Sequence, residues 1–113
     1  MGPAGDAVEI ESRSDNPATI SPTGTRMWTA IADSVFDLEG HRDLIPAVMP
    51  AATDARFWRK RGTAAYGVGL YDEQTGFSDL LARFHGHDER VSVESVERTA
   101  TLYERILLHL GAD

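Results

Sequence analysis

The sequence predicts an α/β fold, a layered sandwich in which helices pack on a mixed, partly parallel sheet. Apolar runs typical of strands alternate along the chain with segments of helical periodicity. Glycine and proline breakers separate these runs, as expected at the ends of elements. The length of 113 residues and the apolar content of 42% suit one globular domain. We therefore assign residues 1–113 to a single domain and expect residues 1–6 to be disordered.

The first half of the chain predicts one strand, one loop and one helix. Residues 7–12, "AVEIES", alternate apolar and acidic positions, which indicates a strand with one solvated face. Residues 12–24 contain two prolines and several hydroxyl side chains, which predict a loop. From Thr25 onward apolar residues recur at three- and four-residue steps, which predicts a helix that ends within residues 38–43. Its predicted apolar stripe contains Met27, Trp28, Ile31, Ala32 and Val35.

The middle of the chain predicts two further strands around a short helix. Residues 44–52 form an apolar run broken by prolines, which we interpret as a buried strand leading into a turn. Residues 53–62 begin with threonine and aspartate and stop at a glycine, a pattern typical of a short capped helix. Residues 63–70 form another apolar run, and residues 71–84 predict a loop with a turn of helix.

The last segment has the clearest helical pattern. Ser92 is suited to cap the start of the helix, and Gly111 is suited to end it. The predicted apolar stripe contains Val93, Val96, Ala100, Tyr103, Ile106, Leu107 and Leu110.

Composition narrows the classes of partner. The net charge of −7, from 18 acidic and 11 basic residues, argues against nucleic acid as a partner. The absence of cysteine excludes disulfides and thiolate ligands, so a metal would need His, Asp or Glu. We find no leader pattern and no apolar run of membrane-spanning length. We therefore expect a cytoplasmic protein without a membrane partner.

Two polar stretches follow predicted strands. Ligands of α/β folds gather at the carboxyl ends of strands, which would let residues 53–56 and 85–89 share one cleft. Residues 56–61, "RFWRKR", place four cations in six positions, and either a solvated helix face or a site for an anionic group would explain them. Residues 84–90, "FHGHDER", are compatible with a metal site, a catalytic cluster or a polar loop.

The two stretches together resemble a known family. "ATDARFWRKRGTAAYGVGL", followed by "FHGHDERVSVESVERTATLYERIL", closely resembles the C-terminal end of the catalytic domain of dinuclear zinc peptidases and deacylases. That family includes aminoacylase, acetylornithine deacetylase, succinyl-diaminopimelate desuccinylase and glutamate carboxypeptidases. The resemblance is strong over residues 45–110 and weaker over residues 7–36. It implies a partial catalytic domain that lacks the N-terminal half and the lid domain. Ala64 and Leu70 depart from the family, which commonly has proline at both places.

The resemblance also implies roles for four residues. His85 falls on the family's zinc-ligating histidine, and Arg56 falls on the arginine that binds the free carboxylate of the substrate. Imidazole is a good zinc ligand, and the planar guanidinium matches a carboxylate. We expect Asp54 and Glu89 to cap a helix and to fix orientation rather than to bind metal. The other three histidines are expected at the surface.

Most of the family's active site is implied to lie outside this sequence. Family members bind two zinc ions through ligands that come mainly from N-terminal sequence, together with a glutamate general base. A catalytic zinc needs about three protein ligands, so His85 alone predicts at most weak zinc binding. We therefore assign no catalytic residue to this chain.

The leading hypothesis is a C-terminal fragment of a zinc-dependent metallopeptidase or amidohydrolase. Such an enzyme would cleave an amide beside a free carboxylate in a small N-acyl amino acid or peptide, and the fragment would be inactive alone. A non-catalytic binding or oligomerisation module that retains the hydrolase fold is the alternative, and a remnant without selected function is a third. Unpaired strand edges would favour a homo-oligomer or a complementing N-terminal chain.

Overall fold

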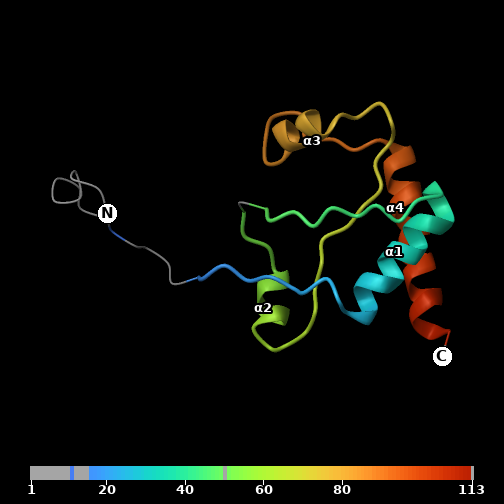
Figure 1. The fold of residues 1–113 in the computed structure, drawn as a ribbon. Coiled ribbons are helices and arrows are strands. Elements are labelled where there is room, and N and C mark those ends of the chain that lie inside the picture. The colour runs from blue at the N-terminus through green and yellow to red at the C-terminus, as the bar shows by residue number, and fades with distance from the viewer. Residues whose placement is uncertain (1–10, 12–15, 50, 113) are drawn as a thin grey trace.

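The computed structural model describes residue 11, residues 16–49 and residues 51–112. The expected disorder of residues 1–6 and nearly all of the predicted strand at 7–12 lie outside the described residues. Within the described part, four helices are joined by extended segments (Figure 1). The helices are α1 (Arg26–Glu39), α2 (Ala55–Arg59), α3 (Phe77–Arg83) and α4 (Val93–Gly111).

The two long helices form the centre of the structure. Helices α1 and α4 pack against each other, whereas α2 and α3 contact no other helix of the described chain. Figure 1 shows α2 and α3 apart from each other and away from the α1–α4 pair. At the rim of the pair, Arg98 Nη2 lies 2.7 Å from Glu39 Oε1, which joins α4 to α1. None of the described helices combines the length and the apolarity needed to cross a membrane.

The predicted α/β sandwich is wrong for the described residues, which contain helices but no strand and no sheet. Residues 63–72 run extended, and within residues 64–71 the backbone hydrogen bonds of the described structure are made with side chains. The Ala65 N–H donates to Ser21 Oγ at 2.9 Å, and the Leu70 N–H donates to Thr99 Oγ1 at 3.1 Å. A sheet needs N–H and C=O groups of neighbouring strands to pair with each other. Side-chain hydroxyls occupy the positions that a neighbouring strand would fill.

The predicted buried strand at 44–52 is also wrong where the structure describes it. Ile45 is 91% exposed and Val48 is 74% exposed, so the apolar run faces solvent. Pro46 has no N–H to contribute to a strand ladder. Leu44, at the start of this run, packs at the margin of the core.

Helix α1 begins and ends as the sequence predicts. Thr25 is the N-cap, and its Oγ1 accepts a hydrogen bond from the Trp28 N–H at 3.1 Å. The helix ends at Gly40, which has a left-handed φ of 77° and donates its N–H to the Phe36 carbonyl at 2.9 Å. Glycine adopts this conformation without a steric penalty, so it is a common helix terminator.

Helix α4 starts at the predicted cap, but its buried face agrees only in part with the predicted stripe, of which Ile106 is buried and Leu110 packs against the core. The Ser92 Oγ accepts a hydrogen bond from the Ser95 N–H at 3.0 Å, which confirms the cap. Leu102, outside the predicted stripe, is fully buried, and Ser95 and Ile106 are buried with it. Three residues of the predicted stripe are more than half exposed, namely Val93, Val96 and Leu107. The buried face includes hydroxyl positions that bind the chain segment before α3, and apolarity alone does not identify it.

The core lies between α1 and α4 and is small. Its buried apolar members are Ala30, Ile31, Val35, Leu102 and Ile106. The extended segment 63–72 covers one side of this core through Tyr66, Val68 and Leu70, which are partly buried against it. The Tyr66 ring also meets the Trp28 ring edge to face, with centroids 5.6 Å apart.

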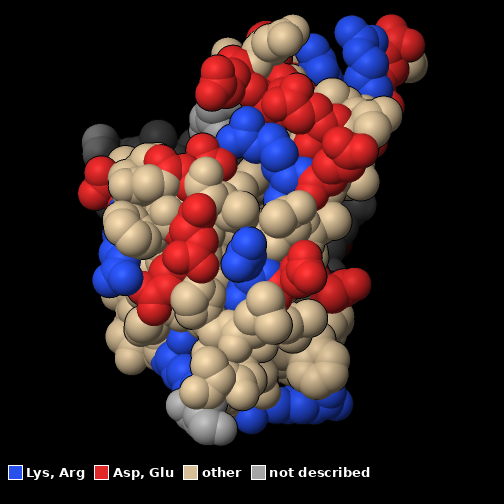
Figure 2. All heavy atoms as spheres, turned by 90° about the vertical axis from the view of Figure 1, so that its right-hand side faces the viewer, with Lys and Arg blue, Asp and Glu red and all other residues tan. Residues whose placement is uncertain are grey.

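The described molecule is elongated. Its radius of gyration is 18.0 Å, whereas a compact chain of this length would have about 13 Å. Figure 2 shows acidic and basic side chains interleaved on the face that looks toward the viewer, with uncharged surface between them. The small core accounts for this shape, because neither α2 nor α3 contributes a residue to it.

Candidate functional site

Arg56 lies on α2 with its guanidinium over the ring of the next residue. The distance from the guanidinium carbon to the Phe57 ring centroid is 4.7 Å. The Arg56 Nε atom is buried and has no hydrogen-bond partner among the described residues. A buried donor without an acceptor costs free energy, so this atom favours an acceptor that comes from outside the described chain. Arg56 is therefore half-buried rather than a fully solvated cation.

Asp54 occupies the N-cap position of α2 but does not act as the cap that the sequence predicts. Its backbone has φ −66° and ψ −16°, and its side chain makes no capping hydrogen bond. An N-cap residue usually has an extended backbone, which aims its side chain at the free N–H groups of the first turn. The helical backbone of Asp54 removes that geometry. Its predicted role in orienting Arg56 stays a prediction.

Arg59, one turn after Arg56, has a structural role that sequence analysis missed. Its Nε and Nη2 donate to the Ala65 carbonyl at 2.9 and 2.8 Å, and its Nη1 donates to Thr19 Oγ1 at 3.3 Å. Between Arg59 and Ala65, the chain turns at Gly62, which has a left-handed φ of 83°. The predicted glycine stop was the only sequence signal for this turn. The cationic stretch thus contains one arginine that binds the backbone and one with a free donor.

His85 lies in an exposed turn that follows α3. Two non-glycine residues of this turn have left-handed backbones, His85 with φ 58° and Asp88 with φ 59°. The Gly86 N–H donates to the Arg83 carbonyl at 3.1 Å, which tightens the turn. Left-handed backbone is uncommon for residues with a side chain. Two such residues within four positions reverse the direction of the chain and present the imidazole at the surface.

The donor set around His85 does not by itself fit a zinc ion. No group of three or more His, Asp or Glu side chains that could hold a metal occurs in the part of the chain that the structure describes. A zinc site takes about three protein ligands, and His85 supplies one imidazole. His87 is exposed in the same turn, as predicted. His109 is only half-exposed, and its Nε2 lies 2.9 Å from Asp37 Oδ2, which joins α4 to α1.

The structure does not bring Arg56 and His85 into one cleft. Helices α2 and α3 make no contact with each other in the described structure. Figure 1 shows them well separated, with the extended segments between them. The expectation of a shared cleft depended on a parallel sheet, and without the sheet the two stretches have no common edge.

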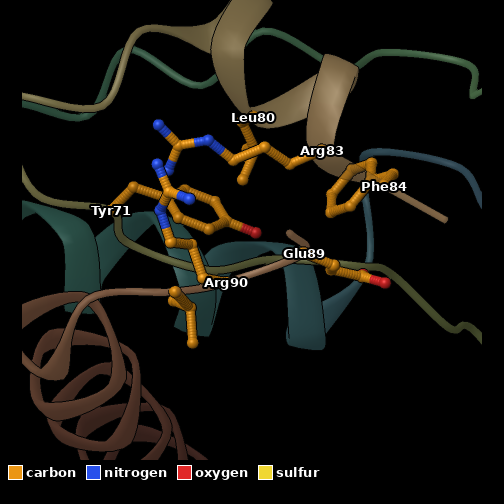
Figure 3. Close-up of a pocket in the computed structure, with 7 residues that line it drawn as sticks. Tyr71, Leu80, Arg83, Phe84, Glu89 and Arg90 are labelled. Atoms are coloured by element: carbon orange, nitrogen blue, oxygen red, sulfur yellow. The ribbon is translucent and has the colours of Figure 1, made fainter. Parts of the chain in front are cut away.

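Glu89 lines a pocket of about 270 Å³ between α3 and the chain that follows the turn (Figure 3). The other lining residues are Tyr71, Leu80, Arg83, Phe84, Arg90 and Val91. In Figure 3 the Glu89 carboxylate points away from the two arginines of the pocket. Glu89 thus shares a pocket with these arginines, and its predicted role in orienting His85 stays a prediction.

Asp72 is the most strongly perturbed acid of the described chain and was not singled out from the sequence. Asp72 is 8% exposed, and its Oδ1 accepts hydrogen bonds from the N–H groups of Gln74 and Thr75 at 3.0 and 2.8 Å. Its Oδ2 accepts from the hydroxyls of Ser92 and Ser95. Hydrogen bonds from Ser92, Thr75 and Ser95 hold the pKa of Asp72 well below its usual value, although burial acts in the opposite direction.

The Asp72 network positions the pocket relative to the helix pair. It ties the start of α4 to the segment that carries Tyr71, which lines the pocket. Asp72 and Ser92 are separated by 20 residues, so no local sequence pattern indicates this contact.

The chain matches a known protein family. A family model described as peptidase family M20/M25/M40 matches residues 4–109. The matched range contains α1, α2, α3 and most of α4, together with both polar stretches. Searches of curated proteins and of solved structures gave no significant match.

Proposed function

Because the chain belongs to peptidase family M20/M25/M40, we propose that it forms part of a zinc-dependent hydrolase that cleaves an amide bond beside a free carboxylate. The family match over residues 4–109 is the observation that carries this proposal. The family is generally metal-dependent. The proposed substrate is a small N-acyl amino acid or peptide.

We assign recognition of the substrate carboxylate to Arg56. Its buried Nε lacks an acceptor among the described residues, and the Phe57 ring lies against one face of the guanidinium. A ring at that face favours one orientation of the guanidinium plane. A carboxylate can accept two parallel hydrogen bonds from such a plane.

We assign metal ligation to His85. Its place in a reversed, exposed turn supports the proposal, because the imidazole is accessible to ligands from another segment. The remaining ligands and the general base would come from an N-terminal segment or from a complementing chain. Asp54 and Glu89 would orient Arg56 and His85 without binding metal.

The role of Arg56 is tested in the enzyme assembled from this chain and its N-terminal complement. We expect Arg56→Lys to lower kcat/KM for N-acyl amino acids by an amount equivalent to about 1–3 kcal/mol, because lysine cannot form the bidentate contact. Arg61→Lys is the matched control, since Arg61 is an exposed cation five positions along the same stretch. An unchanged kcat/KM in Arg56→Lys would leave Arg56 as a surface cation.

The role of His85 is tested on the chain alone. We expect weak zinc binding by calorimetry and no hydrolysis of N-acyl amino acids, because one imidazole does not complete a zinc site. His85→Ala should remove the residual zinc binding, whereas His87→Ala should leave it. Turnover by the pure chain at the rate of an enzyme would contradict the proposal.

A binding module without hydrolytic activity is the second candidate. The unpaired Arg56 Nε favours it, because carboxylate binding needs Arg56 but no metal. This candidate predicts that N-acyl amino acids bind with a dependence on Arg56, and that no turnover appears even when the complementing chain is present.

A further inference from the structure

The pocket beside α3 results from the turn that contains His85. Arg83 ends α3, and the two left-handed residues reverse the chain, so that Arg90 returns beside the helix end. Figure 3 shows the side chains of Arg83 and Arg90 reaching the same end of the pocket, next to Tyr71. Residues seven positions apart in the sequence thus place two guanidinium groups at one site.

The two guanidinium groups have no anionic partner in the described structure. Neither Arg83 nor Arg90 forms an ion pair or a side-chain hydrogen bond with another described residue. The one carboxylate that lines the pocket, Glu89, points away from them in Figure 3. Two like charges at one site repel each other, and an anion between them relieves that repulsion. Arg98 differs from both, because its guanidinium forms an ion pair with Glu39.

The rest of the pocket is apolar. Leu80, Phe84 and Val91 line it together with the Tyr71 ring. The volume of about 270 Å³ lies just below the usual range for small-molecule sites, which is about 300–1,000 Å³. A ligand of this site therefore combines a compact apolar group with an anionic group.

We propose that this pocket binds a small organic anion, with a phosphate or carboxylate group held between Arg83 and Arg90 and an apolar group against Leu80, Phe84 and Val91. Each guanidinium can form two parallel hydrogen bonds with such a group. The site does not contain Arg56 or His85. The proposal is therefore independent of the proposed hydrolase function.

The test titrates the full chain with phenyl phosphate, phenylacetate and inorganic phosphate. Calorimetry and the NMR signals of the arginine side chains detect the binding. We expect saturable binding of a phenyl-bearing anion, with a Kd of about 1 mM or below. Arg83→Gln and Arg90→Gln should each weaken that binding by about tenfold, since each removes a charged donor pair. The relative affinity of phenyl phosphate and phenylacetate identifies the preferred anionic group.

Arg105→Gln is the control for loss of one positive charge, because Arg105 is exposed on α4 and does not line the pocket. Circular dichroism shows whether each variant keeps its helices. Arg83→Lys and Arg90→Lys keep the charge while removing the planar donor pair. No saturable binding of any probe, or binding that survives both Gln variants, would overturn the proposal. Arg56→Lys should leave this binding unchanged, so failure here is distinguishable from failure of the hydrolase proposal.

Discussion

Asp72 shows how the fold alters the chemistry of one residue. Its carboxylate accepts hydrogen bonds from two backbone N–H groups and from the hydroxyls of Ser92 and Ser95. These bonds favour the charged form, so the pKa of Asp72 in the folded chain lies below its value in the unfolded chain. The resulting stabilisation is present above the unfolded pKa of about 3.9 and is lost as pH falls toward the folded pKa.

We therefore expect Asp72→Asn to be less stable than the unmodified chain at neutral pH. The difference in the free energy of unfolding should shrink as pH falls below about 4, because protonation then removes the same interaction from the unmodified chain. Urea denaturation at a series of pH values measures this difference. Asp43→Asn is the control, since Asp43 is an exposed carboxylate without a described partner. The same pH dependence in both variants would contradict the prediction.

The arginines show what the sequence predicts at the scale of the residue and what it does not. The stretch at 56–61 is recognisable as cationic, and Arg56 could be chosen from its resemblance to a family motif. The contact of Arg59 with Thr19 could not be predicted in this way, because Thr19 lies 40 positions away. Arg83 and Arg90 come together because two residues between them have left-handed backbones. Neither residue is a glycine, so the sequence does not indicate this conformation.

The helices are the part of the fold that the sequence predicts well. Capping residues act locally, so Thr25 and Ser92 identify the starts of α1 and α4 correctly. The predicted strands failed because an apolar run becomes a strand only when a neighbour pairs with it, and that neighbour is not encoded in the run. Helix α3 was predicted as a loop with a turn of helix, and it has seven residues.

The buried face of α4 gives a prediction at the scale of the element. We expect Leu102→Ala to destabilise the chain by about 2–5 kcal/mol, because Leu102 is fully buried in the small core. Leu108→Ala is the matched control. Its side chain is 58% exposed, so the expected change stays within about 0.5 kcal/mol. Chemical denaturation measures both, and equal losses would mean that α4 buries another face.

At the scale of the whole molecule, the exposed apolar surface is the main feature. Ile20, Ile45 and Val48 are each more than 70% exposed on the extended segments, and Leu107 is 69% exposed on α4. Large exposed apolar patches mark surfaces that associate with other chains. The small core and the elongated shape leave these residues without cover from the described chain.

We therefore expect the chain to form a dimer or higher oligomer, or to bind tightly to a chain that supplies an N-terminal half. The net charge of −7 should keep the assembly soluble. Sedimentation velocity at micromolar concentration measures the state of the chain alone. Combining Ile45→Ser with Val48→Ser should weaken association through the extended segments, and Leu107→Ser tests the face of α4 separately. A compact, folded monomer would contradict the prediction.

The hydroxyls of α4 have a consequence for the exchange of backbone hydrogens with solvent. The N–H groups of Leu70 and Asp72 lie in a segment without secondary structure, yet they donate to the side chains of Thr99 and Ser95. Their protection from exchange lasts only while α4 stays docked. The exchange of these two amides should therefore report the free energy of the opening that separates α4 from this segment.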